Sequence, residues 1–246
     1  MNVFVTGGSR GIGRAIVVKF AEEGYGCAFT YVGNEEKAKE TVALALEKNP
    51  ETKIKAYKLD LKDSGAIETV ADEVIEEYGE IGVVVNNAAT VRNNAAAFMS
   101  DDEWNDVITT NLSGPFFVIR SFLMHLISNR FGRIINISSL AQDGCSGQVN
   151  YAASKSGIIG LTRTLAREYG AKNITANIVT VGYVQTDMTG DNLAKKLHEI
   201  WLDYCPMKRV GTAEEIAGMV HYLTTEPAAF INGEYIRVSG GLTYIP

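Results

Sequence analysis

The chain of 246 residues has 46% hydrophobic and 21% charged residues, the composition of a folded globular protein, which excludes a disordered chain. Its formal net charge of −6 argues against nucleic acid as a partner, because an acidic surface repels phosphate. The three cysteines are far apart and the three histidines lack ligand spacing, so neither a disulfide framework nor a structural metal site is expected. Without a cationic leader, or an apolar run of the roughly 20 residues that a membrane span needs, we expect a cytoplasmic protein.

Short β-branched runs alternate with longer segments of helical period along the whole chain. Strands are predicted at residues 2–5, 27–31, 53–59, 83–85, 133–137, 174–180 and 234–238. Helices are predicted at residues 10–23, 35–48, 64–78, 100–111, 115–128, 151–169 and 212–223, with capping boxes at Ser100 and Thr212. This alternation predicts a single α/β domain over residues 1–246, with a doubly wound parallel sheet of Rossmann type. The least periodic stretch, near residues 183–207, is expected to form a mobile substrate lid.

A glycine-rich turn, Thr-Gly-Gly-Ser-Arg-Gly-Ile-Gly, joins the first strand to the first helix. Gly7 permits a tight turn, Gly11 lets the backbone approach a pyrophosphate, and Gly13 lets the helix pack close to the sheet. The helix N-terminus adds free N–H groups and a partial positive charge. The G-x-x-x-G-x-G spacing differs from the common dinucleotide fingerprint, and a purely structural turn is the alternative. The position predicts a dinucleotide site made by Gly7, Ser9, Arg10, Gly11, Ile12 and Gly13.

The end of the second strand indicates which dinucleotide binds. Sites for NAD carry an acidic residue there, which holds the ribose 2′-hydroxyl. Here Tyr31 is followed by Val-Gly-Asn, and Arg10 in the glycine turn is free to bind a 2′-phosphate. A solvated arginine is the alternative for Arg10, and the nearby Glu35 and Glu36 keep NAD open. We predict NADP(H).

Tyr151 and Lys155 lie four residues apart on a predicted helix, one above the other on the same face. A phenol with a pKa near ~10 is a poor acid at neutral pH, and a neighbouring cation is expected to lower that pKa. The pair could then pass a proton to a developing alkoxide. Tyr204 and Lys208 have the same spacing, but Pro206 interrupts it. On spacing alone, a core tyrosine is an equal alternative for Tyr151.

Polar residues follow two other predicted strands. Ser138 and Ser139 end the fifth strand, Asn87 and Ala88 follow the fourth, and Asn111 ends the helix that the Ser100 box begins. Ligands of open α/β sheets bind at the carboxyl ends of the strands. A serine hydroxyl at that edge could therefore hydrogen-bond a substrate carbonyl.

With these motifs in this order, the sequence resembles the short-chain dehydrogenase/reductases, and within them most closely the 3-oxoacyl-carrier-protein reductases. The similarity spans essentially residues 2–242, through residues 6–13, Asp60, 86–89, Asn111, 138–139, Tyr151 with Lys155, 182–186 and 240–241. The resemblance implies a catalytic tetrad of Asn111, a serine, Tyr151 and Lys155, in which Asn111 anchors a water and Lys155 also holds the ribose. It further implies cofactor contacts from Asp60, Leu61, Asn87, Ala88, Val184 and Thr186.

The sequence departs from the family pattern at three places. Ala89 replaces a usual glycine, Val181 replaces a usual proline, and the loop before Tyr151 is one residue short. The usual spacing to the tyrosine selects Ser138, whereas the strand register selects Ser139, and alternate strand residues face opposite sides. Loops absorb deletions more readily than strands change register, so we predict Ser139. The departures suggest a specialised substrate, of polyketide type rather than housekeeping fatty acid.

The resemblance implies NADPH-dependent reduction of a 3-oxoacyl thioester, on an acyl carrier protein of fatty-acid or polyketide type, to the 3-hydroxyacyl thioester. Arg130 and Lys172 match carrier-docking positions and are expected near the rim of the site, with solvated surface cations as the alternative. The family also implies a homotetramer and no metal. The alternatives are reduction of another ketone, such as a sugar, steroid or xenobiotic, and a nucleotide-binding module without turnover.

Overall fold

The computed structural model describes residues 1–184, 195–243 and 245. Seven strands form one sheet in the order β3-β2-β1-β4-β5-β6-β7, and every described pair of neighbouring strands is parallel. The order reverses between β1 and β4, which confirms the predicted doubly wound α/β fold. The strands are β1 Asn2–Val5, β2 Gly26–Tyr31, β3 Ile54–Lys58, β4 Ile81–Asn86, β5 Gly132–Ser139, β6 Ile174–Val181 and β7 Tyr235–Val238.

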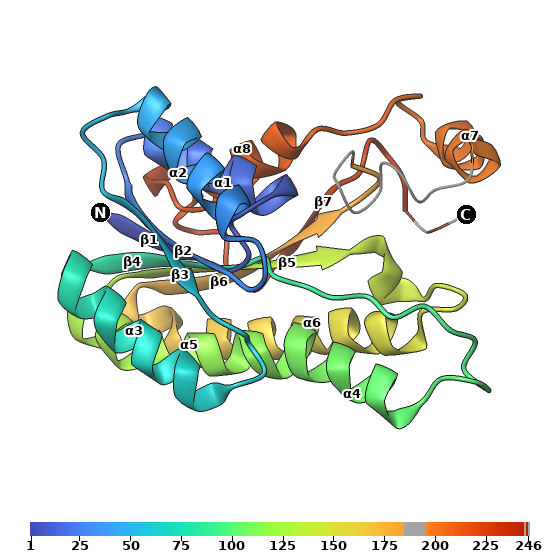
Figure 1. The fold of residues 1–246 in the computed structure, drawn as a ribbon, viewed down its shortest axis with the longest axis horizontal. Helices are drawn as coiled ribbons and strands as arrows, with labels where there is room; N and C mark the ends of the chain where they lie inside the picture. Colours follow the sequence, from blue (N-terminus) through green and yellow to red (C-terminus); the bar gives the residue numbers. More distant parts are fainter. Residues whose placement is uncertain (185–194, 244, 246) are drawn as a thin grey trace.

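Helices cover both faces of the sheet (Figure 1). One face carries α1 Gly11–Glu22, α2 Glu35–Lys48 and α8 Ala213–Tyr222. The other face carries α3 Ser64–Tyr78, α4 Asp101–Ile108, α5 Gly114–Asn129 and α6 Val149–Tyr169. The remaining α-helix of the described chain, α7 Lys195–Tyr204, lies beyond the carboxyl ends of the strands.

The core consists of two apolar layers, one on each side of the sheet. All six residues of β4 are buried, as expected for a central parallel strand covered on both faces. Because side chains alternate along a strand, Val85 packs in the layer beneath α1 with Phe20, while Val84 packs in the opposite layer with Phe122. This sandwich holds the carboxyl ends of the strands in fixed relative positions.

The two helices predicted at residues 100–111 and 115–128 are continuous in the structure. Both capping boxes are present, and the helix that begins after Ser100 runs through a π-helical turn, Thr109–Ser113, directly into α5. Pro115, which lacks a backbone N–H, lies directly after the π-helical turn, in the first turn of α5. The π turn therefore joins two helices that the sequence analysis predicted as separate.

The continuous helix Asp101–Asn129 is the one described helix that is long and apolar enough, by length and composition alone, to cross a membrane. Val118, Phe122 and Leu126 on this helix are buried in the core layer next to the sheet. Packing in the core therefore explains the apolar residues on this face of the helix, whereas Phe116 and Met124 on the same helix are exposed.

The predicted lid falls partly outside the described residues, at residues 185–194. In the described part, Trp201 of α7 packs against Tyr183, with ring centroids 5.1 Å apart. Helix α7 ends at Tyr204, and Lys208 has a left-handed backbone with φ of 54°. Tyr204 and Lys208 therefore do not share a helix face, as predicted, whereas the lid itself stays a prediction.

Candidate active site

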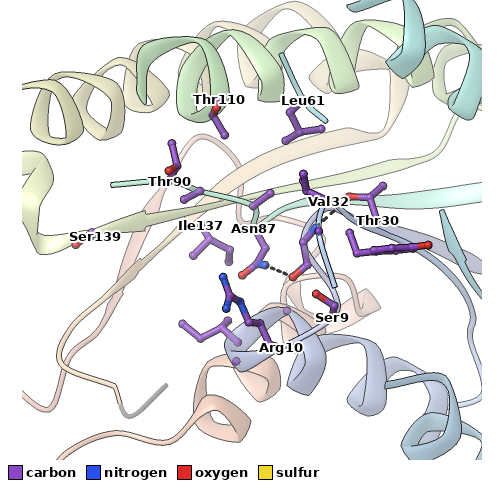
Figure 2. Close-up of a pocket in the computed structure, with 18 of the residues that line it drawn as sticks. Ser9, Arg10, Thr30, Val32, Leu61, Asn87, Thr90, Thr110, Ile137 and Ser139 are labelled. Atoms are coloured by element: carbon purple, nitrogen blue, oxygen red, sulfur yellow. Dashed lines mark hydrogen bonds between the residues drawn. The ribbon is translucent and has the colours of Figure 1, made fainter. Parts of the chain in front are cut away.

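A cleft of about 740 Å³ opens at the carboxyl ends of the strands, where the strand order reverses. Figure 2 shows Ser9 and Arg10 on the α1 side of this cleft, with Thr90 and Thr110 on the opposite side. The predicted cofactor residues that the structure describes all border it: Gly7, Ser9, Arg10, Gly11, Ile12, Gly13, Tyr31, Asp60, Leu61, Asn87, Ala88, Tyr151, Lys155 and Val184. Thr186, the other predicted contact, lies outside the described residues.

The glycine turn adopts a shape that only glycine allows at several positions. Gly7 and Gly11 have φ of 68° and 53°, in the left-handed region that side chains disfavour. A Cβ added at Gly13 would lie 2.1 Å from the carbonyl oxygen of Gly7 and 2.5 Å from the Asn87 amide nitrogen. Gly13 therefore lets α1 approach the turn itself, rather than the sheet as the sequence analysis proposed.

Thr6 and Asn87 fasten this turn to the end of β4. The Thr6 hydroxyl oxygen accepts hydrogen bonds from the backbone N–H groups of Asn87 (3.0 Å) and Ala88 (3.1 Å). In return, the Asn87 side-chain amide donates to the carbonyl oxygens of Thr6 and Gly7, both at 3.0 Å (Figure 2). Asn87 thus fixes the shape of the turn, in addition to bordering the cleft.

The start of α1 is open to an anion. Arg10 occupies its N-cap position without a side-chain cap hydrogen bond. Four other helices are capped by the side chains of Asn34, Asp63, Ser100 and Thr212. The N–H groups in the first turn of α1 therefore point, without a side-chain cap, toward the position where a pyrophosphate binds. The turn fits a dinucleotide.

The surroundings of Arg10 favour a 2′-phosphate over a free ribose hydroxyl. Lys37 also borders the cleft, as do residues 32–34, and its ammonium pairs with Glu40 at 2.9 Å. Glu35 and Glu36 do not line it, and both form ion pairs with Lys39 on the surface of α2. The lining of the cleft therefore includes two cations, Arg10 and Lys37, and neither of these glutamates.

Asp60 both stabilises a turn and borders the cleft. Its carboxylate accepts a hydrogen bond of 3.0 Å from the backbone N–H of Lys62. The Lys62 ammonium in turn pairs with Asp106 at 3.0 Å, and Arg92 pairs with Asp106 at 3.0 Å. Sequence reasoning missed this charged rim, because its members come from segments far apart in the chain.

The two serines at the end of β5 have different surroundings. Ser139 lies near the Tyr151 phenol and acts to lower its pKa, whereas Ser138 is buried and donates to the Gln142 amide oxygen at 2.8 Å. This alternation follows from the strand register, in which Ser138 pairs with Thr180. The structure brings Ser139 to the phenol, as the register prediction expects, and its catalytic role stays a prediction.

The electrostatics of the tyrosine and lysine differ from the prediction. Burial raises the pKa of Tyr151 to about 12, although the hydrogen bond from Ser139 acts to lower it. Burial also lowers the pKa of Lys155 to about 8. The Lys155 ammonium donates a 2.8 Å hydrogen bond to the carbonyl oxygen of Ile137 and lies 5.6 Å from the centre of the Tyr151 ring. The predicted net lowering of the Tyr151 pKa is therefore wrong for this geometry, because desolvation outweighs the effect of the neighbouring cation.

Asn111 lies in the π-helical turn and is buried. Its side-chain amide accepts from the N–H of Thr90 at 2.8 Å and donates to the carbonyl oxygen of Thr90 at 2.9 Å. The structure thus pairs this amide with the backbone after β4, and the role of Asn111 in anchoring a water stays a prediction. Thr90, which borders the cleft, was missed, although it directly follows the motif at residues 86–89.

Arg130 and Lys172 are not at the rim of this cleft. Arg130 lies two residues before the start of β5 and Lys172 two residues before the start of β6, so both lie at the amino ends of parallel strands. An eight-residue strand such as β5 spans roughly 25 Å, and the cleft is at its other end. The predicted position near the rim of the chain's own site is therefore wrong.

A comparison with known proteins adds to this geometry. A family model described as enoyl-(acyl carrier protein) reductase matches residues 7–243. The 3-oxoacyl-(acyl-carrier-protein) reductase FabG of Staphylococcus aureus strain Mu50 is 40% identical over 242 residues, covering 98% of this chain and 97% of its own. FabG of Escherichia coli K12 is 39% identical over 243 residues, covering 97% and 95%. The solved structure of levodione reductase is 30% identical, with a TM-score of 0.93 over 97% of this chain and 96% of its own.

Proposed function

Since this chain belongs to the short-chain dehydrogenase/reductase family, we propose that it reduces 3-oxoacyl thioesters to 3-hydroxyacyl thioesters with NADPH. It is an oxidoreductase of the ketoreductase class. The observation that carries the proposal is that Ser139 and Tyr151 lie near each other and border the same cleft as the glycine turn. Two hydroxyl groups at that place can hold one carbonyl oxygen beside a dinucleotide.

The cofactor is held by the parts of the cleft already described. NADPH, when bound, supplies the hydride for the carbonyl carbon. The turn around Gly7 and Gly11 and the open N-terminus of α1 hold the pyrophosphate, and Arg10 with Lys37 holds the 2′-phosphate. These contacts orient the cofactor.

Tyr151 is the proton donor of the reduction. Its pKa of about 12 keeps the phenol protonated at neutral pH, so it can donate to the oxygen of the ketone as negative charge develops there. Ser139 donates a second hydrogen bond to that oxygen. Lys155, with a pKa of about 8, is mostly cationic at pH 7, and its charge stabilises the phenolate that remains after proton transfer.

The names of the similar proteins suggest three reactions: reduction of an enoyl thioester, of a 3-oxoacyl thioester and of levodione. We favour the 3-oxoacyl thioester, because the FabG relatives match at 39–40% identity over almost the full length of both chains. The test is NADPH oxidation with an acetoacetyl thioester, a crotonyl thioester and a cyclic diketone. Fastest turnover of the acetoacetyl thioester supports the proposal, and fastest turnover of the crotonyl thioester contradicts it.

The acyl group is carried by an acyl carrier protein, and the enzyme works as a homotetramer. Phe116 and Met124 on α5 are exposed, which supports an interface through this helix. Arg130 and Lys172 could guide a carrier only to the cleft of another subunit, because they lie at the opposite edge of their own sheet. The tetramer is therefore part of the docking proposal. A cytoplasmic location stays a prediction.

A further inference from the structure

The peptide groups on both sides of the Tyr151 Cα are held by buried side chains. The N–H of Tyr151 donates a 2.7 Å hydrogen bond to the side-chain oxygen of Asn150. Its carbonyl oxygen accepts a 2.8 Å hydrogen bond from the hydroxyl of Ser154. Asn150 and Ser154 have no exposed surface, so water does not compete for these bonds.

The same two side chains lead back to the backbone after β4. The Asn150 amide nitrogen donates to the carbonyl oxygen of Arg92 at 3.2 Å. The Ser154 hydroxyl accepts a 3.4 Å hydrogen bond from the amide nitrogen of Asn111. The Asn111 side chain also accepts from the N–H of Thr90 and donates to the carbonyl oxygen of Thr90. Tyr151 and residues 90–92 are therefore joined twice, and the hydrogen bonds form a closed ring.

This ring connects the reacting group to the wall of the cofactor cleft. Residues 87–90 and Arg92 border the cleft, and Tyr151 borders it as well. A shift of the backbone at Thr90 or Arg92 would pull on both peptide groups of Tyr151. Networks of buried and satisfied hydrogen bonds transmit such shifts because they resist independent movement of their members.

We propose that Asn150 is a positioning residue, which, together with Asn111 and Ser154, couples occupancy of the cofactor cleft to the position of the Tyr151 phenol. The inference rests on the proposed role of Tyr151 as proton donor. Asparagine suits this position because one side chain supplies an acceptor for Tyr151 and two N–H donors. The second donor is also used, by the carbonyl oxygen of Glu103 at 3.1 Å, which ties α4 to the same point.

The kinetic test compares Asn150→Ala and Ser154→Ala with Gln148→Ala. Gln148 is a matched control because its amide also joins the two loops, through Asn93 at 3.0 Å, in a bond outside the ring. We expect Asn150→Ala to lower kcat for an acetoacetyl thioester about tenfold or more, since small misplacements of a reacting group are costly. The KM for the thioester should change by less than about twofold, and the Kd for NADPH should change less than kcat, because the ring acts mainly on positioning.

The double variant Asn150→Ala/Ser154→Ala tests whether the two residues act as one ring. Opening the ring at one point removes most of its effect, so the double variant should lose less activity than the product of the single losses. Ser154→Ala also keeps the test valid if Asn150→Ala does not fold. Single variants with the kcat of Gln148→Ala, or losses in NADPH binding as large as those in kcat, would overturn the inference.

A second readout does not depend on the substrate. The ultraviolet absorbance of tyrosinate, with Tyr151→Phe as the blank, follows the titration of Tyr151 with and without saturating NADP⁺. We expect NADP⁺ to change the Tyr151 pKa in the parent and in Gln148→Ala, and to change it less in Asn150→Ala and Ser154→Ala. No cofactor-linked change in the parent, or an equal change in all variants, would overturn the coupling. If the parent reduces no ketone, the proposed substrate fails while this titration still decides the coupling.

Discussion

The ammonium nitrogen of Lys155 lies 5.6 Å from the centre of the Tyr151 ring. Its 2.8 Å hydrogen bond goes to the carbonyl oxygen of Ile137, at the end of β5. At this distance the lysine charge acts on the phenol through space, in an interior where charge is poorly screened. The pair therefore depends on the lysine remaining protonated.

A pH dependence follows from this relationship. Burial lowers the pKa of Lys155 to about 8, so its charge is present below that pH and is lost as the pH rises through it. The Tyr151 phenol, with a pKa of about 12, keeps its proton over the same range. We expect kcat for ketone reduction to fall as the pH rises through about 8, measured at saturating NADPH. In Lys155→Met this step should disappear from a slower enzyme, and its persistence there would assign it to another group.

The two serines provide a second prediction. Ser139→Ala should lower kcat about 100-fold, the usual cost of removing one hydrogen-bond donor to the reacting oxygen. Ser138→Ala removes the buried bond to Gln142, so it should mainly lower the free energy of unfolding, by about 1 kcal/mol. Steady-state kinetics and denaturant unfolding of both variants separate these effects. The reverse ranking of the two kcat values would assign the catalytic hydroxyl to Ser138.

Arg10 is expected to discriminate between the two nicotinamide cofactors. Arg10→Ala should raise the KM for NADPH about tenfold or more, because it removes a charge-assisted contact with the 2′-phosphate. The KM for NADH should be almost unchanged. Arg130→Ala is the control, since it removes an exposed arginine at the opposite edge of the sheet. Equal losses with both cofactors would make Arg10 a structural residue of the turn.

Charge reversal at the amino ends of β5 and β6 tests carrier docking. Arg130→Glu combined with Lys172→Glu should lower kcat/KM for a carrier-bound substrate at low salt, since charges at the edge of a protein–protein interface act mainly on the association rate. Activity on a small thioester should be unchanged, because both residues are far from their own cleft. Size-exclusion chromatography must show that the variant keeps the oligomeric state of the parent. Unchanged activity on the carrier-bound substrate would remove this surface from the docking proposal.

Local sequence signals predicted most of the fold. The capping residues Ser100 and Thr212 marked their helix starts correctly, because a cap depends on neighbours three residues away. The π turn around Asn111 was not predictable in this way, because Pro115 resembles a helix boundary and the turn is stabilised by the distant Thr90. Helix α7 was also missed, because it lies within the least periodic stretch of the chain, near residues 183–207.

The sequence predicted those site residues whose position follows from the order of strands and helices along the chain. Residues that follow a strand, such as Asn87 and Ser139, meet at the carboxyl edge, and they do border the cleft. The same reasoning would have corrected Arg130 and Lys172, since residues that precede parallel strands lie at the other edge. The pKa of Tyr151 could not be predicted from its spacing to Lys155, because burial depends on packing that the local sequence does not encode.

The central claim is that Tyr151 donates the proton during ketone reduction, and NADPH oxidation with an acetoacetyl thioester by the parent, Tyr151→Phe and Tyr204→Phe tests it most directly. Tyr204 is the matched control, a tyrosine with the same spacing to a lysine but at the end of α7. We expect Tyr151→Phe to bind NADPH like the parent and to lose at least about 1,000-fold in kcat, or roughly 4 kcal/mol of transition-state stabilisation. Tyr204→Phe should keep the parent rate. A Tyr151→Phe variant that retains most of the parent kcat would contradict the account.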